Sequence, residues 1–272
     1  MMNRRRRTLL LLLFAIIFLS AITIAGAMLE ERATLTDFTQ KNLPPDRTHL
    51  FGTDFMGRDM FARTISGLSL SIRIGLLTAL ISTLIAFLLG TAAATLGKGV
   101  DATISWLIDL TMGIPHILLL ILISFAVGKG FMGVLIGITL SHWMSLARII
   151  RSEVMQLQHS GYIRVAEKLG VRKALIVQRH MLPHLMPQLM IGFVLLFPHA
   201  ILHEASITFL GFGLSPEQPA IGIILAESMR YLTMGYWWLA ALPGLMLIIT
   251  VLLFNLAGKA LVKLNNPASA HL

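Results

Sequence analysis

The chain has no cysteine and little charge: only 13% of its 272 residues are Asp, Glu, Lys or Arg. The absence of thiols excludes disulfide bonds and thiolate chemistry. Soluble domains are about one-quarter charged, so this is not the composition of a soluble globular protein. The sequence also lacks an HExxH motif and a glycine-rich phosphate loop ending in lysine. A zinc protease of that type and a P-loop nucleotide hydrolase are therefore excluded.

Hydrophobic residues make up 56% of the chain and form blocks of about 20 or more, which is the length of a helix that crosses about 30 Å of hydrocarbon. The sequence therefore predicts an all-α integral membrane protein with six transmembrane helices. They are expected at residues 8–29, 69–96, 104–127, 132–149, 186–209 and 236–262. The first block follows basic residues, as in a signal peptide, but its length favours an uncleaved span.

The net charge is +9, and most basic residues border the apolar blocks. In a soluble protein this charge would suggest a nucleic-acid partner. Beside membrane spans it is better explained by orientation, because cytoplasmic loops are enriched in Lys and Arg. Placing both termini in the cytoplasm puts fourteen of the 22 basic residues on the inner side, Arg4 to Arg7 among them. We therefore expect cytoplasmic termini, lipid as the surroundings and no nucleic-acid partner.

This topology divides the chain into three segments. Residues 1–29 are the cytoplasmic N-terminus and first span, residues 30–67 are extracytoplasmic, and residues 68–272 form a five-helix core with a cytoplasmic loop at residues 150–185. Within the extracytoplasmic segment, residues 55–65 are expected to form an amphipathic helix at the membrane interface. Asp59 and Arg63 would form an i,i+4 ion pair on that helix.

The cytoplasmic loop contains a charged stretch, residues 160–185, that is too regular for a plain hydrophilic loop. Its apolar residues recur at helical spacing: Tyr162, Val165, Ala166 and Leu169. The pattern predicts a short amphipathic helix that Gly170 ends. A second short helix, residues 171–181, is expected to stop at Leu182-Pro183. We interpret the stretch as a docking element for a partner protein. A solvated interfacial helix without a partner is the alternative.

Two further stretches carry recognisable motifs. Residues 52–59, GTDFMGRD, resemble a GTDxxGRDxxSR signature, with Ala62 in the place of its serine. Residues 204–213, EASITFLGFG, resemble the motif EASLSFLGLG. In the charged stretch, the spacing from Gly170 to Leu182-Pro183 resembles the "EAA" loop of importers, whose first three residues fall on Arg164-Val165-Ala166. Val165 departs from the usual alanine there.

In this order and spacing, the motifs resemble those of inner-membrane permease subunits of ATP-binding-cassette (ABC) importers of the dipeptide, oligopeptide and nickel group. The resemblance implies a type I ABC importer permease fold in a bacterial inner membrane, and a transport subunit rather than an enzyme. It implies a homologous second permease, two ATP-binding subunits and an extracytoplasmic solute-binding protein as partners. This chain would bind no cofactor, because ATP and Mg are used by the ATP-binding subunits.

The resemblance also assigns roles to residues. Tyr162, Val165 and Leu169 would be apolar anchors on the ATPase, and Arg164 its ionic contact. The full set implied to couple transport to ATP hydrolysis is Tyr162, Arg164, Val165, Ala166, Leu169, Gly170, Leu182 and Pro183. The outer signature would contact the solute-binding protein or the second permease, unless it is only an interfacial helix. Its residues are Gly52, Asp54, Gly57, Arg58 and Asp59.

Two details favour nickel or a metal–metallophore complex as cargo. They are the run Ser141-His142-Trp143 and the pair His199 and His203. A dipeptide or oligopeptide is the alternative, because Glu204-Ala205-Ser206 is more peptide-like. A stand-alone secondary transporter is a third possibility, although we find no internal repeat of the kind common in that class. An intramembrane enzyme using Ser141 and His142 is disfavoured, because neighbours on a helix point about 100° apart.

Five residues within the spans are candidates for the substrate path. His199 and His203 are four apart and share a helix face, and imidazole suits nickel, so both are also candidate metal ligands. Asp109 and His116 are seven apart and would share a face of the third span. Glu204 follows the histidine pair. Packed histidines bonded across helices are the alternative, and for His142 we expect a structural bond to the backbone.

Overall fold

The computed structural model describes residues 4–265, which are almost entirely helical. Five helices are long: α1 (Arg4–Met28), α3 (Met60–Thr95), α6 (Phe131–Gln158), α9 (Leu182–Phe209) and α11 (Trp238–Asn265). The shorter ones are α2 (Glu30–Thr34), α4 (Lys98–Met112), α5 (His116–Val127), α7 (Gly161–Lys168), α8 (Lys173–Ile176) and α10 (Ile221–Leu232). Within the described residues, β-structure is limited to one isolated bridge, Thr53 to Asp59. The all-α prediction is confirmed.

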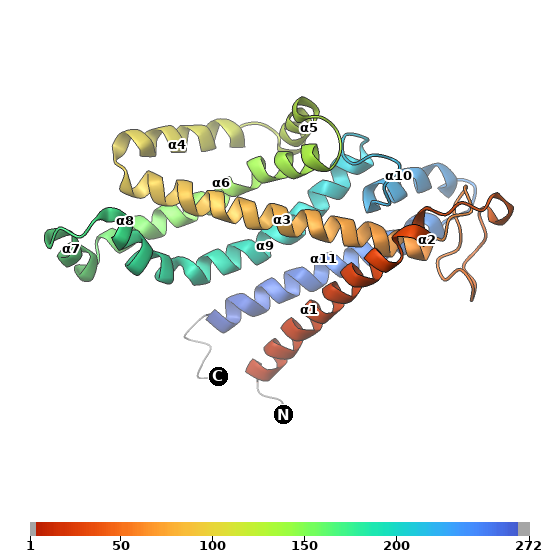
Figure 1. Cartoon of the computed structure of the whole chain (residues 1–272), viewed down its shortest axis with the longest axis horizontal. Coiled ribbons are helices and arrows are strands. Elements are labelled where there is room, and N and C mark those ends of the chain that lie inside the picture. The colour runs from red at the N-terminus through yellow and green to blue at the C-terminus, as the bar shows by residue number, and fades with distance from the viewer. Residues whose placement is uncertain (1–3, 266–272) are drawn as a thin grey trace.

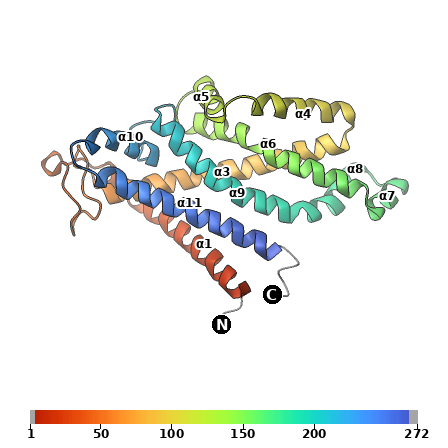
Figure 2. The ribbon, with the colours of Figure 1, turned by 180° about the vertical axis from the view of Figure 1, so that it is seen from behind.

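The helices form an elongated bundle (Figures 1 and 2). Helices α3, α6 and α9 lie at its centre, α1 and α11 run side by side along one flank, and α4 and α5 lie on the other. Helices α7 and α8 occupy one end, which we call the inner end, and α2 and α10 occupy the opposite, outer end. Five helices are long and apolar enough to cross a membrane, or up to six if α4 and α5 together count as one bent span.

The loops alternate between these two ends as the predicted topology requires. At the inner end, the Gln158 amide donates to the Ala94 carbonyl (3.0 Å) and Lys173 Nζ donates to the Thr95 carbonyl (3.1 Å). At the outer end, Ser124 Oγ donates to the Phe212 carbonyl (3.0 Å). Residues 1–3 and 266–272 and the side chains of Arg4, Arg5, Arg7 and Lys263 lie outside the described part of the chain, so cytoplasmic termini stay a prediction.

The third predicted span is not one helix. Helix α4 ends at Met112, α5 begins at His116, and the two axes differ by 101°. Pro115 explains the break, since it has no N–H to donate and it restricts the residue before it to extended conformations. The expectation that Asp109 and His116 share a helix face is therefore wrong, because the two residues belong to helices that point in different directions (Figure 1).

The interfacial helix expected at residues 55–65 is also absent. Residues 55–59 lie in turns, and the helix that begins at Met60 continues without a break to Thr95. Asp59 caps this helix, because its carboxylate accepts from the Ala62 N–H (2.9 Å). The 36 residues of α3 span about 54 Å at 1.5 Å per residue. The outer segment is therefore attached directly to the longest helix of the bundle.

The predicted stop at Leu182-Pro183 is wrong as well. A π-helical segment, Val177–Met181, joins α8 to α9, and the helix continues through Pro183. The Leu182 N–H reaches back five residues to the Val177 carbonyl, which is the π-helical spacing. Pro183 lies in the first turn of α9, where its missing N–H costs less than in a helix interior. Residues 173–181 of the charged stretch consequently extend α9 toward the inner end, and the turn at Gly170 joins α7 to this extension.

Candidate functional site

Helix α7 presents an apolar surface at the inner end of the bundle. Tyr162, Val165 and Leu169 are 49%, 57% and 76% exposed. Ile163, on the opposite side, is fully buried in a core cluster that also contains Ile150 of α6. Helix α7 therefore has one face fixed in the membrane domain and a second apolar face with no cover from the described residues. The sequence pattern identified the second face and missed Ile163.

Gly170 ends α7 with a Schellman motif. The Gly170 N–H donates to the Glu167 carbonyl (3.0 Å) and the Val171 N–H donates to the Ala166 carbonyl (3.1 Å). Gly170 has a φ of +74°, and a Cβ at this position would have no atom within 4 Å. The requirement for glycine is therefore conformational and not steric. The motif sets the angle between α7 and the helix that continues into α9.

We predict that Gly170→Val impairs transport while Gly170→Asn retains most of it. A left-handed conformation costs about 1–2 kcal/mol for a residue with a Cβ, and asparagine tolerates it better than a β-branched residue. The measurement is substrate uptake by cells that produce each variant, normalised to the amount of protein in the membrane. Equal uptake by both variants would show that the φ of residue 170 does not matter for coupling.

The other predicted coupling residues lie beside this surface. Tyr162 packs near His180 of the π-helical segment, with ring centroids 6.0 Å apart. Arg164 is exposed, and a guanidinium nitrogen of Arg164 lies 3.1 Å from His159 Nδ1. Ala166 and Leu182 are half-buried, and Pro183 is exposed. The structure thus gathers the predicted coupling residues at one end of the molecule. Their contact with an ATPase stays a prediction.

The outer signature forms a network of ion pairs inside the chain. Asp54 accepts from Arg58 Nε (2.7 Å) and from the guanidinium of Arg63. Both arginines also reach Glu227 of α10, at 3.2 Å and 3.0 Å. Arg63 is only 2% exposed. The network joins the outer segment to α3 and to α10, so these side chains hold the outer end together.

The expected ion pair between Asp59 and Arg63 does not form. Asp59 pairs with Arg32 of α2 instead (2.7 Å), in addition to capping α3. The two glycines of the signature lie in tight turns: the Gly52 N–H donates to the His49 carbonyl (2.9 Å) and the Gly57 N–H donates to the Asp54 carbonyl (2.9 Å). Gly57 has a φ of +74°, and a Cβ there would collide with the Asp37 carbonyl. The signature therefore has a structural use that its sequence alone did not indicate.

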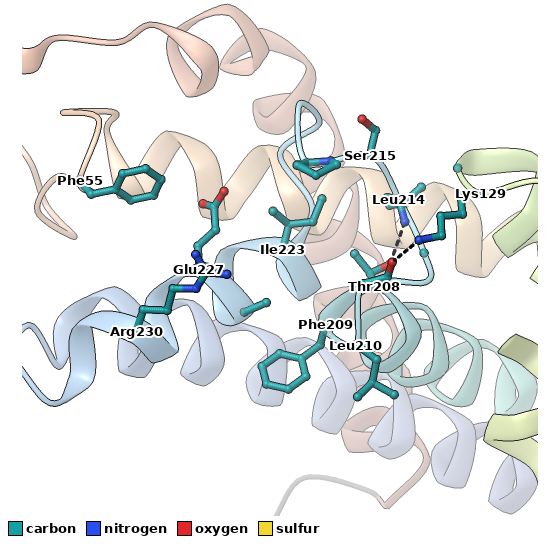
Figure 3. Close-up of a pocket in the computed structure, with 15 residues that line it drawn as sticks. Phe55, Lys129, Thr208, Phe209, Leu210, Leu214, Ser215, Ile223, Glu227 and Arg230 are labelled. Atoms are coloured by element: carbon teal, nitrogen blue, oxygen red, sulfur yellow. Dashed lines mark hydrogen bonds between the residues drawn. The ribbon is translucent and has the colours of Figure 1, made fainter. Parts of the chain in front are cut away.

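A surface pocket of about 760 Å³ lies next to this network (Figure 3). Its wall includes Phe55, Glu227 and Arg230 on one side and Lys129 and Thr208 on the other. Figure 3 shows Lys129 reaching toward the loop that follows α9, where its Nζ donates to the Gly211 carbonyl (3.1 Å). The pocket lies at the outer end of the bundle, beside α10.

Three histidines from separate helices gather within the bundle. His116 of α5, His142 of α6 and His203 of α9 each offer a ring nitrogen, and these nitrogens all lie within 4.8 Å of one another. The bond expected for His142 is present, since its Nδ1 lies 2.8 Å from the Ile138 carbonyl. His199 is exposed and is not a member of this group. His203 thus belongs to a group of three, and a metal-ligand role for His199 and His203 as a pair stays a prediction.

Two other path candidates do not join the histidines. Glu204 is fully buried, and its two carboxylate oxygens accept from Ser71 of α3 and from Thr208 of α9. This carboxylate bridges two packed helices in the structure, and its expected position on a transport path stays a prediction. Asp109 is exposed and pairs with Arg148 of α6. It fastens α4 to α6 together with the ion pair between Asp101 and Arg151 (2.5 Å).

Comparison with known proteins identifies the family. The model of the family "Binding-protein-dependent transport system inner membrane component" matches residues 82–271, more than half of the chain. A dipeptide transport system permease of Bacillus subtilis (strain 168) is 30% identical over 256 residues, which cover 94% of this chain and 80% of that protein. A putative peptide transport system permease of Brucella suis biovar 1 (strain 1330) is 33% identical over 267 residues, which cover 98% of this chain and 89% of that protein.

A solved structure agrees at the level of the fold. A chain of the inward-facing MetNI methionine ABC transporter superposes with a TM-score of 0.60 and 20% identity, over 75% of this chain and 96% of that chain. The predicted type I ABC importer permease fold is thereby confirmed. The chain, a multi-pass helical membrane protein, belongs to the family of inner-membrane components of binding-protein-dependent transport systems.

Proposed function

We propose that this chain forms one half of the transmembrane path of an ABC importer for short peptides, and that α7 couples it to the ATPase. The observation that carries the coupling is the exposed apolar face of Val165 and Leu169 on a helix whose other face is buried. Large exposed apolar side chains outside a membrane span mark protein-binding surfaces. The Gly170 turn and the continuous helix into α9 give that surface a rigid connection to the membrane domain.

The partners follow from this role. An ATPase binds α7 from the cytoplasm, and a solute-binding protein delivers cargo at the outer end. A second, homologous permease completes the path and supplies a second docking site, so that two ATP-binding subunits are engaged. The N-terminus of α1 and the C-terminus of α11 then lie in the cytoplasm.

Peptides are the cargo that the relatives support. The two relatives described above are named dipeptide and peptide permeases, and another, of Bacillus subtilis (strain 168), is an oligopeptide permease. The nickel interpretation receives no specific support from these names. We therefore propose peptides, and not nickel, as the first candidate cargo.

Import of nickel or a metal–metallophore complex is the second candidate. The gathering of His116, His142 and His203 favours it, because imidazole nitrogen is a preferred ligand of nickel, copper and zinc. A metallophore is also an organic molecule of about the size of a short peptide, so both cargoes are compatible with a peptide-type permease.

Uptake by a deletion strain carrying this chain on a plasmid separates the two candidates. We expect labelled di- and tripeptides to accumulate, and unlabelled peptides to compete, with no effect of added nickel. Uptake of labelled nickel that depends on the chain, with or without a chelator, together with no peptide uptake, would reject the peptide proposal in favour of the second candidate. A Val165→Asp variant is the negative control in both arms.

A further inference from the structure

We infer that His116, His142 and His203 form a binding site for a divalent transition-metal ion. The ring centroids are 4.4 Å apart for His116 and His203, 5.0 Å for His116 and His142, and 5.1 Å for His142 and His203. Metal–nitrogen bonds of about 2.1 Å in a tetrahedral site place ligand nitrogens about 3.4 Å apart. The nitrogens lie within 4.8 Å of one another, so side-chain movements of about 1 Å close the site.

The break between α4 and α5 creates this arrangement. His116 is the first residue of α5, directly after Pro115, and the 101° bend gives α5 a direction different from that of α4. Helix α5 packs against α6 and also touches α9, which supply His142 and His203. A straight third span would have directed His116 along the same line as Asp109. The proline break therefore serves to bring one imidazole to the other two.

The protonation of His142 suits metal binding. Its Nδ1 donates to the Ile138 carbonyl (2.8 Å), and Ser141 Oγ lies beside the same nitrogen (3.1 Å). When Nδ1 carries the proton, the lone pair of a neutral imidazole is on Nε2. Metal-ligating histidines commonly donate their second nitrogen to a backbone carbonyl in this way, which fixes the tautomer and the ring orientation.

His116 contributes an independent observation. Its Nε2 is buried, and no described residue forms a hydrogen bond with it. Buried polar atoms without a partner are uncommon and call for an explanation, an ion being one. A metal bound by the group of three would supply the missing partner of this nitrogen.

The donor set defines the class of ion. Three imidazoles without a carboxylate suit zinc, copper, nickel and cobalt, whereas magnesium and calcium require oxygen ligands. The neighbouring carboxylate, Glu204, is occupied by Ser71 and Thr208 and is not available as a ligand. Three protein ligands also leave a coordination position open for water or for a donor atom of the cargo.

The test measures metal binding to the purified full-length chain in detergent, without a polyhistidine tag and with any subunits that co-purify. Co²⁺ is titrated and followed by its visible absorption, and Ni²⁺ is titrated by calorimetry. We expect one equivalent to bind per chain, and affinity to fall by about 100-fold or more in His116→Ala, His142→Ala and His203→Ala, since even second-layer partners are worth 10- to 100-fold. His184→Ala, an exposed histidine of the same helix α9, should leave binding unchanged.

His203→Ala is a decisive variant because His203, like His116, is only half-buried, whereas His142 is buried and its replacement is more disruptive of the fold. The fold of His203→Ala is checked by its thermal unfolding midpoint, which should equal that of the metal-free wild type. If this folded variant binds Co²⁺ as tightly as the wild type, the inference is overturned. Binding that depends on His199 and His203 but not on His116 and His142 would overturn it as well. No peptide is present in the assay, so its outcome is independent of the peptide proposal.

Discussion

Leu169→Asp is expected to abolish ATP-driven uptake without unfolding the membrane domain. Leu169 is 76% exposed, so the substitution breaks no packing within the chain. An apolar anchor at the centre of an interface contributes about 2 kcal/mol or more to binding, which is roughly 30-fold in affinity. A carboxylate at position 169 would also lose its water on contact with the ATPase, which adds a desolvation cost. The measurements are cargo uptake in cells and co-purification of the ATPase subunits with the tagged chain.

A matched pair of variants separates loss of docking from loss of fold. Leu50→Asp introduces the same charge at a leucine that is 58% exposed in the outer segment, and it should retain the ATPase subunits. Ile163→Asp places the charge in the buried face of α7 and should lower the amount of folded protein. If Leu169→Asp retains both the ATPase subunits and wild-type uptake, the coupling role assigned to α7 is incorrect.

The sequence predicted the helices well wherever hydrophobicity alone determines them. The long apolar blocks, the charged stretch and the turn at Gly170 all appear in the structure, because each depends on local composition or on one backbone requirement. Two errors occur at Pro115 and Pro183, and a third is the interfacial helix expected at residues 55–65. A proline can end a helix, break a span or be absorbed by a π-helical turn, and the choice among these depends on neighbours distant in the chain.

The candidate site was harder to predict because it is assembled across helices. Spacing along one helix correctly placed His203 on a face, but it could not show that His116 and His142 arrive from α5 and α6. The same limit applies to Glu204, whose partners Ser71 and Thr208 lie on two helices. For the outer signature, pairing at i,i+4 suggested Asp59 as the partner of Arg63, whereas the actual partners include Glu227 of α10. Tertiary contacts override local pairing in each case.

Arg63→Met is expected to destabilise the folded chain strongly. The guanidinium of Arg63 is buried and bridges Asp54 and Glu227. Its removal leaves two carboxylates with Arg58 as their one shared cation among the described residues. Breaking a buried ion pair from one side costs about 3–5 kcal/mol, because the remaining charge is uncompensated. The readout is thermal unfolding of the chain in detergent, with Arg32→Met as the control. Arg32 is 55% exposed in its pair with Asp59, so its loss should cost about 1 kcal/mol or less.

A double variant tests whether charge, rather than lost packing, causes the effect of Arg63→Met. In Arg63→Met with Glu227→Gln, Arg58 faces the single carboxylate of Asp54 and the local charges balance again. The double variant should therefore be more stable than the sum of the two single losses implies, since residues in one network have interaction energies of 0.5–3 kcal/mol. If the stability losses of the two single variants are strictly additive in the double variant, Arg63 acts through its packing volume. The ion pairs would then not be what joins the outer segment to α10. A positive coupling energy would assign that role to charge, and it would explain why the signature in the outer segment consists of side chains that are mostly buried.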